Sequence, residues 1–99
     1  MKILNTKFNG LEIIEGIKFD DSRGYFREIF LKKLFKKKKF IFWCMSKSKK
    51  NALRGMHIQT KKTQAKIVSV VKGKILDVVI DCRPKSKSFG KNFKTILSE

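Results

Sequence analysis

The chain has 99 residues, enough for one small domain. Hydrophobic residues make up 41% of it, and nine are Phe, a composition that excludes general disorder. The longest apolar run, residues 40–45, is far shorter than the roughly 20 residues that span a bilayer. Polar residues also follow the first Met too closely for a secretory signal. We therefore expect a soluble, cytoplasmic protein that does not bind membranes.

The net charge of +17 is compatible with three readings. A field of this size attracts polyanions such as nucleic acid. However, the basic residues are mostly lysines spread along the chain, with arginine only at positions 23, 27, 54 and 83. Specific readers of phosphates and bases favour the planar arginine fork. We favour a solvated lysine surface over a nucleic-acid interface, and an anionic small-molecule partner remains the third reading.

Short apolar stretches alternate with connections that contain Gly, Lys and Ser, a pattern typical of an all-β domain. Residues 20–24 predict a turn, and residues 31–37 predict one short helix with Leu31, Leu34 and Phe35 on one face. Gly73 favours a tight turn before the strand that follows, because glycine adopts positive φ without strain. The predicted strands or extended segments are residues 11–14, 25–30, 40–45, 52–59, 66–71, 74–81 and 93–97. So many strands without closure indicate part of a barrel.

The two cysteines, Cys44 and Cys82, do not form a CxxC pair. They also cannot belong to a typical zinc site, because the chain has a single histidine. In a reducing compartment we expect both to be buried thiols without a disulfide.

That histidine, His57, lies in the segment Leu53-Arg54-Gly55-Met56-His57-Ile58-Gln59. Strand alternation would place Arg54 and Met56 on one face, with Gly55, His57 and Gln59 on the other. A face with Gly, His and Gln offers polar groups and space, which suits a ligand cavity. On this pattern alone, a purely structural histidine remains the alternative.

Four more residues are candidates for a binding site. Phe26 and Glu28 are two apart, so they would share one face of a strand as an aromatic platform beside a carboxylate. Arg23 lies in the preceding turn. The alternative without a binding role is a solvated Arg–Glu pair on the surface. Lys66 begins a predicted strand, where a surface position is the more common outcome.

Several of these segments, in this order and spacing, resemble the dTDP-4-dehydrorhamnose 3,5-epimerases. The first are Asp21-Ser22-Arg23-Gly24-Tyr25-Phe26-Arg27-Glu28, Ser46-Lys47-Ser48 and Leu53-Arg54-Gly55-Met56-His57-Ile58-Gln59. The later ones are Gln64-Ala65-Lys66-Ile67-Val68-Ser69-Val70-Val71-Lys72-Gly73, Asp77-Val78-Val79-Ile80-Asp81-Cys82-Arg83 and Ser88-Phe89-Gly90. Each segment alone is weak evidence, and their series is strong.

The resemblance implies a partial, incomplete cupin (jelly-roll-like) β-barrel, with residues 1–99 as the N-terminal portion of one epimerase-like domain. It implies an isomerase, usually a homodimer, that acts on a dTDP-4-keto-6-deoxyhexose in deoxysugar synthesis. His57 would be the base that removes protons beside the ketone, and Lys66 would lie near the sugar ring. Arg54 would help bind the substrate. Arg23 and Glu28 would contact the nucleotide sugar, and Phe26 would lie against the nucleotide.

The resemblance also implies catalysis without a metal or other cofactor. Metal-binding cupins generally use two histidines two residues apart and a later glutamate. Here Gln59 takes the second histidine position and Lys66 the glutamate position. An imidazole, an amide and an ammonium group do not make a divalent-metal site.

The chain departs from the family pattern in two ways. The family's proton-donating tyrosine, its second histidine and the aspartate that orients the base have no counterpart here, and Tyr25 cannot take the first of these roles. Phe42 and Cys44 stand where the family commonly has Gln and Asn. We therefore expect a truncated form of the epimerase. The alternatives are a non-catalytic sugar-nucleotide binding remnant and a related dTDP-sugar isomerase.

Overall fold

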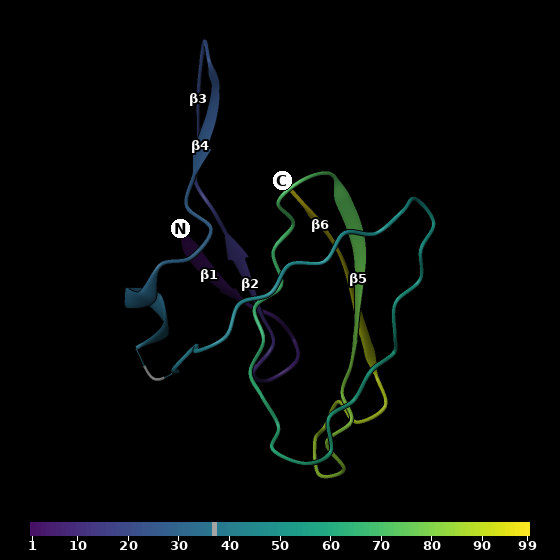
Figure 1. Cartoon of the computed structure of the whole chain (residues 1–99). Helices are drawn as coiled ribbons and strands as arrows, with labels where there is room; N and C mark the ends of the chain where they lie inside the picture. The colour runs from purple at the N-terminus through teal and green to yellow at the C-terminus, as the bar shows by residue number, and fades with distance from the viewer. Residues whose placement is uncertain (37) are drawn as a thin grey trace.

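The computed structural model describes residues 1–36 and 38–99 as strand ribbons joined by long irregular segments (Figure 1). Within these residues, six strands form three separate antiparallel two-stranded sheets, with one short 3₁₀ helix between them. The sheets are β1(Lys2–Asn5) with β2(Glu12–Glu15), β3(Lys18–Asp21) with β4(Gly24–Arg27), and β5(Lys74–Ile80) with β6(Asn92–Ser98). The predicted all-β class is confirmed, as an incomplete β fold without a closed barrel.

The β1–β2 ribbon pairs Ile3 with Ile14 and Leu4 with Ile13. The loop between its strands folds back because the Thr6 hydroxyl donates to the Leu11 carbonyl at 2.8 Å. The ring of Phe8 in this loop is the most buried apolar side chain described, at 3% exposed. β1 was not predicted, since its four residues at the chain start carry no turn signal before them.

The β3–β4 hairpin projects away from the other ribbons (Figure 1). Its turn confirms the prediction for residues 20–24, although β3 itself was missed. Asp21 stabilises the turn by accepting the backbone N–H of Arg23 at 2.8 Å, and Gly24 takes φ +136°, which suits only glycine.

The predicted short helix is present as η1(Lys32–Phe35), while Lys37 lies outside the described residues. Phe35 is buried, and its ring centroid is 5.4 Å from those of Phe30 and Phe40. Trp43 joins the group with an edge-to-face contact to Phe30 at 6.0 Å. We call Phe30, Phe35, Phe40 and Trp43 the aromatic cluster.

The β5–β6 ribbon is the longest, with seven residues in each strand. Both strands were predicted, and the turn before β5 has Gly73 at φ +83°, as expected. Opposite residues lie on the same face of an antiparallel pair, so Asp77–Thr95 and Val79–Phe93 face inward. Leu76 and Ile96, which pair with each other, form the outer face.

The strands predicted at residues 40–45, 52–59 and 66–71 are absent, and these predictions were wrong. Their β-branched and aromatic residues favour strands only where a neighbouring strand completes the hydrogen-bond ladder. No described segment supplies one, so Phe42, Leu53 and Val68 remain exposed. Cys44 and Cys82 are exposed free thiols for a similar reason, which corrects the expected burial.

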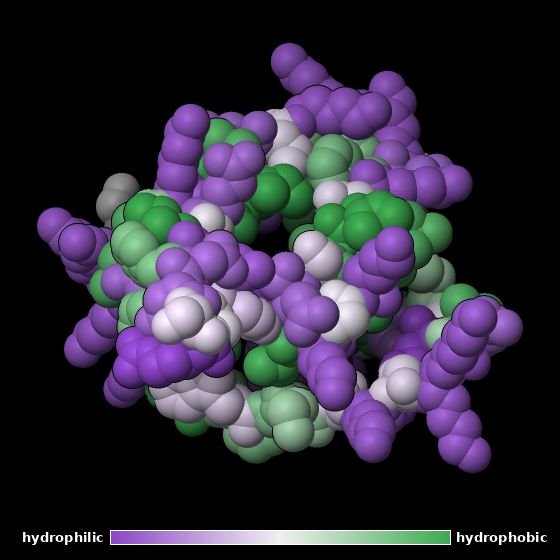
Figure 2. All heavy atoms as spheres, turned by 90° about the horizontal axis from the view of Figure 1, so that it is seen from above, coloured by the Kyte–Doolittle hydropathy of each residue, from purple (hydrophilic) through white to green (hydrophobic). Residues whose placement is uncertain are grey.

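The molecule is open. Its accessible surface is 9587 Å², against about 5,800 Å² for a compact monomer of this mass. Its radius of gyration is 15.2 Å, compared with about 12.6 Å expected for a compact domain. Apolar groups are visible between the long polar side chains around a central hollow (Figure 2). No helix among the described residues has the length and apolar character needed to cross a bilayer.

Candidate functional site

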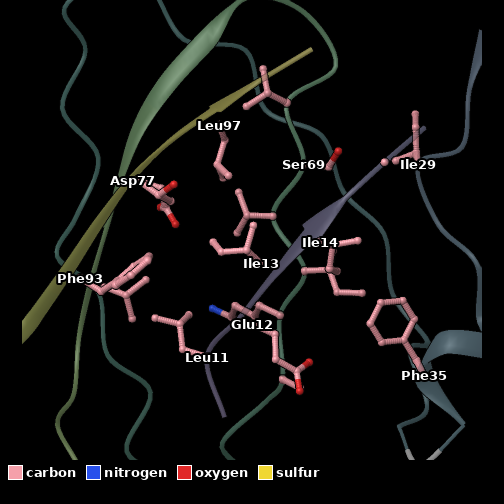
Figure 3. A pocket seen from close by; sticks show the side chains of 18 of the residues that line it. Leu11, Glu12, Ile13, Ile14, Ile29, Phe35, Ser69, Asp77, Phe93 and Leu97 are labelled. Carbon is pink, nitrogen blue, oxygen red and sulfur yellow. The ribbon is translucent and has the colours of Figure 1, made fainter. Parts of the chain in front are cut away.

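A cavity of about 880 Å³ lies between β2, the inward face of β5–β6 and the irregular segments near residues 56–58 and 64–70. Leu11, Ile13 and Leu97 form part of its apolar wall (Figure 3). Phe35 and Phe40 of the aromatic cluster also line the cavity, and Phe35 is seen in Figure 3. The volume is within the range of sites for small molecules and cofactors.

The cavity brings together three of the predicted site residues, which come from different segments. His57, Lys66 and Glu28 all line it. His57 lines the cavity and is an exposed residue. Gly55, at φ +108°, lies against the imidazole, and a Cβ there would be 3.4 Å from Nδ1 of His57. That distance is an ordinary contact, so the positive φ is what favours glycine at position 55.

The segment around His57 is not a strand in the structure, so the alternation expected for a strand does not apply to it. Met56, His57 and Ile58 are consecutive, and all three line the cavity.

The other three predicted residues do not line this cavity. Arg54 donates from Nε to the Ser48 hydroxyl at 2.8 Å and from Nη2 to the Lys47 carbonyl at 3.1 Å. Arg23 forms an ion pair with Asp21 at 2.7 Å at the tip of the β3–β4 hairpin.

Phe26 is 67% exposed on the same hairpin, where its ring centroid is 6.4 Å from that of Phe19. The structure therefore leaves the site residues in three places: the cavity, the β3–β4 hairpin and the segment of Arg54.

Among the cavity residues that were not predicted as site residues, Asp77 and Arg27 have polar side chains of structural interest. Asp77 is half-buried and points into the cavity from β5 (Figure 3). Strand alternation could have found it, because Asp77 is the polar residue on an inward face with Val79 and Ile75. Arg27 donates to the carbonyl oxygens of Val70 and Ser98, which joins β4 to two distant segments.

The charges around the cavity are balanced, although the chain has a net charge of +17. Its basic side chains are Lys18, Arg27, Lys38 and Lys66, and its carboxylates are Glu12, Glu28, Asp77 and Glu99. Most lysines therefore lie elsewhere, and Figure 2 shows long hydrophilic side chains projecting outward. This distribution favours the solvated lysine surface over a concentrated anion site.

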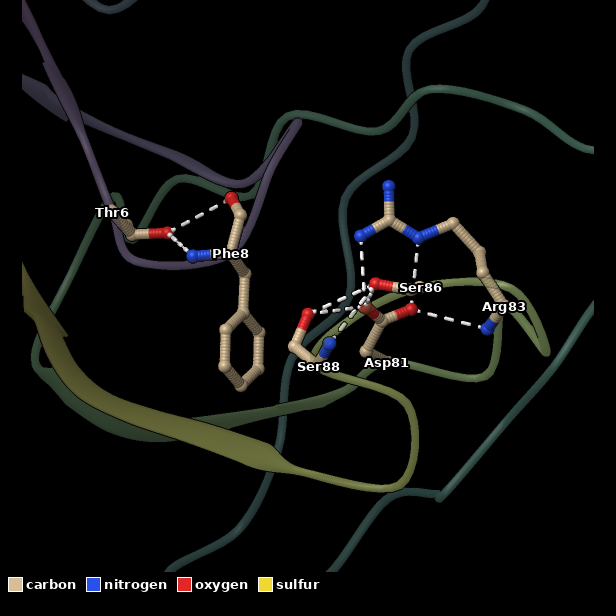
Figure 4. A network of polar contacts seen from close by, with 6 residues as sticks. All are labelled: Thr6, Phe8, Asp81, Arg83, Ser86 and Ser88. Carbon is tan, nitrogen blue, oxygen red and sulfur yellow. Dashed lines mark hydrogen bonds and ion pairs between the residues drawn. The ribbon is translucent and has the colours of Figure 1, made fainter.

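A second polar group, the Asp81 network, lies at the end of β5 (Figure 4). The Asp81 side chain is only 2% exposed. It accepts hydrogen bonds from Arg83 at 2.8 Å and from the Ser86 and Ser88 hydroxyls at 2.6 Å. The Arg83 guanidinium, then the two hydroxyls, hold the pKa of Asp81 far below its ordinary value. The network anchors the loop after β5 rather than contributing to the cavity around His57.

The donor atoms of the site do not favour a metal. Among residues 1–36 and 38–99, no group of three or more His, Cys, Asp or Glu side chains is arranged to hold an ion. The Gln59 amide donates to the Lys62 carbonyl at 3.0 Å. The prediction of cofactor-free chemistry remains a prediction.

Comparison with known proteins agrees with the motif series. The model of the dTDP-4-dehydrorhamnose 3,5-epimerase family matches residues 5–99. Proteins of that name are similar to this chain: one from Neisseria gonorrhoeae is 39% identical over 92% of the chain and 29% of its own length. The protein from Methanothermobacter thermautotrophicus is 37% identical over 90% of the chain and 50% of its own length. The Escherichia coli K12 protein is 36% identical over 99% of the chain and 56% of its own length.

The chain thus spans between 29% and 56% of the length of these relatives. No solved structure matches it. The family match covers nearly the whole chain, including His57 and Lys66 at the cavity. The chain belongs to the dTDP-4-dehydrorhamnose 3,5-epimerase family.

Proposed function

We propose that this chain supplies the base and part of the substrate-binding wall of a dTDP-4-dehydrorhamnose 3,5-epimerase. Its residues 1–99 would be the N-terminal portion of a single cupin domain, and its substrate a dTDP-4-keto-6-deoxyhexose. One observation carries the proposal: a potential base, His57, and a potential cation, Lys66, line the same cavity in a member of this family.

Removal of a proton from the substrate requires few protein groups. A C–H bond beside a ketone is acidic enough for a positioned neutral imidazole, and histidine changes charge close to neutral pH. Proton removal by His57 leaves an enolate, whose oxygen needs a nearby cation or hydrogen-bond donor. Lys66 supplies the ammonium group for this role. These steps use only acid–base groups, so the proposal includes no cofactor.

The nucleotide end of the substrate requires the predicted residues that lie outside the cavity. Phe26 offers an exposed aromatic face, and Arg23 an exposed guanidinium on the same hairpin. Arg54 is tied to surface groups of residues 47 and 48 by hydrogen bonds that solvent can replace. We propose that these long side chains turn toward the sugar nucleotide when it occupies the cavity beside Glu28.

Return of the proton on the opposite face of the sugar requires an acid. Tyr25 is the only tyrosine, and its ring lies under the Lys18 ammonium at 4.4 Å on the β3–β4 hairpin. It therefore has no place in the proposed proton transfer. Proton removal and full epimerisation are separate activities of this site, and they can be measured separately.

The proposal also covers quaternary structure and compartment. The family commonly forms homodimers, and we propose a homodimer here. Two free thiols, Cys44 and Cys82, fit a reducing compartment such as the cytoplasm.

Solvent exchange at the sugar tests the proposed base. In D₂O, proton NMR would follow deuterium entering C3 and C5 of dTDP-4-keto-6-deoxyglucose. We expect His57→Ala to slow exchange by about 10²–10⁴-fold, the usual contribution of a general base. Lys85→Ala is the control, because Lys85 lies in the loop after β5 and does not line the cavity. Equal exchange rates for His57→Ala and the unaltered chain would remove His57 from the mechanism.

Binding without turnover is the second candidate function. It is favoured by one observation: among the described hydrogen bonds, none joins His57 to a carboxylate that would orient it as a base. Titration calorimetry with dTDP distinguishes the two. Binding heat without any deuterium exchange would favour the binding module, and exchange above the background rate would favour the enzyme.

A further inference from the structure

Residues 64–70 form a wall of the cavity without belonging to a strand. All seven residues line the cavity, and Lys66, the proposed cation, is one of them. Ser69 marks this segment in Figure 3. None of the sheets in the described chain includes it. Backbone outside a sheet needs other contacts to keep a fixed position, so the place of the Lys66 ammonium group depends on what holds this segment.

One side chain ties the segment to a distant part of the protein. Among the hydrogen bonds between described residues, only the one from Nη2 of Arg27 to the Val70 carbonyl reaches residues 64–70. The two residues are 43 positions apart in the sequence. The bond is partly buried, and Val70 is 8% exposed. A bond with a charged donor is stronger than a neutral one, and partial burial shields it from water, so Arg27 fixes the end of the segment that follows Lys66.

The same guanidinium extends this tie to β6. Nη1 of Arg27 donates to the Ser98 carbonyl at 3.4 Å. None of the ion pairs between described residues includes Arg27. A planar guanidinium presents several donors in fixed directions, so it bridges two carbonyl groups with a geometry that an ammonium group lacks.

Arg27 also lies at the root of the hairpin that carries the proposed nucleotide contacts. It follows Phe26 directly and precedes Glu28, which lines the cavity. Neighbouring side chains leave a strand on opposite faces, so Arg27 reaches the cavity wall from the same strand that exposes Phe26. The hairpin and the segment of Lys66 therefore meet at Arg27.

We propose that Arg27 is a positioning residue for Lys66. Its guanidinium holds residues 66–70 at the cavity, which keeps the Lys66 ammonium group in place for the enolate oxygen. Arg27 takes no part in the proton transfer itself. This inference rests on the proposed function, because it concerns the cation of that site.

A double-mutant cycle on deuterium exchange at the sugar tests this coupling. Lys66→Ala should slow exchange by about 10²–10³-fold, the usual effect of losing one donor to an oxyanion. Arg27→Met keeps a long side chain and removes the guanidinium. It should lower the maximal rate by up to about 10²-fold, the effect of a 1 Å misplacement, with little change in KM. If Arg27 acts through Lys66, Arg27→Met should slow the Lys66→Ala variant no further.

Two further variants separate position from charge. Arg27→Lys keeps the charge and loses the planar fork, so its rate should fall as that of Arg27→Met does. Full rescue by lysine would instead indicate a purely electrostatic effect. Lys18→Met is the matched control, because Lys18 pairs with Arg27 across the hairpin and forms its ion pair with Asp20 at 3.1 Å. Any effect of Lys18→Met should multiply that of Lys66→Ala.

NMR relaxation of the backbone amides tests the tie without substrate. In Arg27→Met, the order parameters of residues 66–70 should fall toward about 0.6, the value below which backbone is flexible. Asp77 and Val79 of β5 should keep their values and serve as references. If Arg27→Met unfolds the chain, the references will lose order too, and the same measurement on Arg27→Lys then decides.

Four results would overturn the inference. They are an unchanged rate in Arg27→Met when Lys66→Ala is slow, full multiplication of the two effects, full rescue by Arg27→Lys, and unchanged order parameters in residues 66–70. Absence of exchange in the unaltered chain, or an unchanged rate in Lys66→Ala, would count against the proposed function. The order parameters would then decide this inference alone, so the two failures are distinguishable.

Discussion

Phe35 connects the short helix to the cavity, and its replacement tests whether the aromatic cluster holds that wall. Its ring stacks on Phe30 with an interplanar angle of 3° and meets Phe40 edge to face at 80°. Phe35 is 9% exposed, the most buried member of the cluster. Phe35→Leu keeps most of the apolar volume and removes both ring contacts, whereas Phe35→Ala also leaves a void.

The expected loss of stability follows from these contacts. An aromatic pair contributes about 0.5–1.5 kcal/mol beyond its buried area, so the loss of two pairs should destabilise Phe35→Leu by about 1–3 kcal/mol. Phe35→Ala should lose about 3–5 kcal/mol, because the void adds to the lost contacts. A domain of this size has a total stability of about 5–15 kcal/mol, so the alanine variant should be close to unfolding.

Urea unfolding, followed by the fluorescence of the single tryptophan, measures these losses. Trp43 belongs to the cluster, since its ring lies 6.0 Å from that of Phe30. With a denaturant slope of about 1 kcal/mol/M, Phe35→Leu should lower the urea midpoint by about 1–3 M. The control is Phe19→Leu, because Phe19 is 56% exposed and has one ring neighbour, Phe26. Similar midpoints for the two leucine variants would refute the role given to the cluster.

Two further predictions concern the Asp81 network and the thiols. The folded-state pKa of Asp81 lies below its ordinary value of 3.8, so its stabilising effect is present above that value and is lost as the pH falls further. The melting temperature, measured from neutral pH to well below 3.8, should therefore fall in acid, and by less in Asp81→Asn than in the unaltered chain. Identical pH profiles for the two proteins would contradict this reasoning. Cys44 and Cys82 are both exposed, so both should react with a thiol reagent without denaturant, and a thiol that reacts only in urea would contradict their exposure.

The sequence alone determined the local elements that carry their own signals. The turn at residues 20–24 has Asp21 to accept the Arg23 N–H and Gly24 to take positive φ. Gly73 likewise starts β5, and alternation identified both strands of the last ribbon. The motif series also identified the family. Each of these signals lies within a few residues or in residue order, so no distant contact was needed to read it.

Only the tertiary structure decided which segments pair with another strand. The apolar run at residues 40–45 has strong strand propensity, yet a strand forms only where another backbone completes its hydrogen bonds. The site divides for the same reason: His57 and Lys66 reach one cavity, while Arg23 remains on a projecting hairpin. Burial of Asp81 and exposure of Cys44 also depend on which distant groups pack against them. Pairing and burial join residues far apart in the chain, and local patterns do not contain that information.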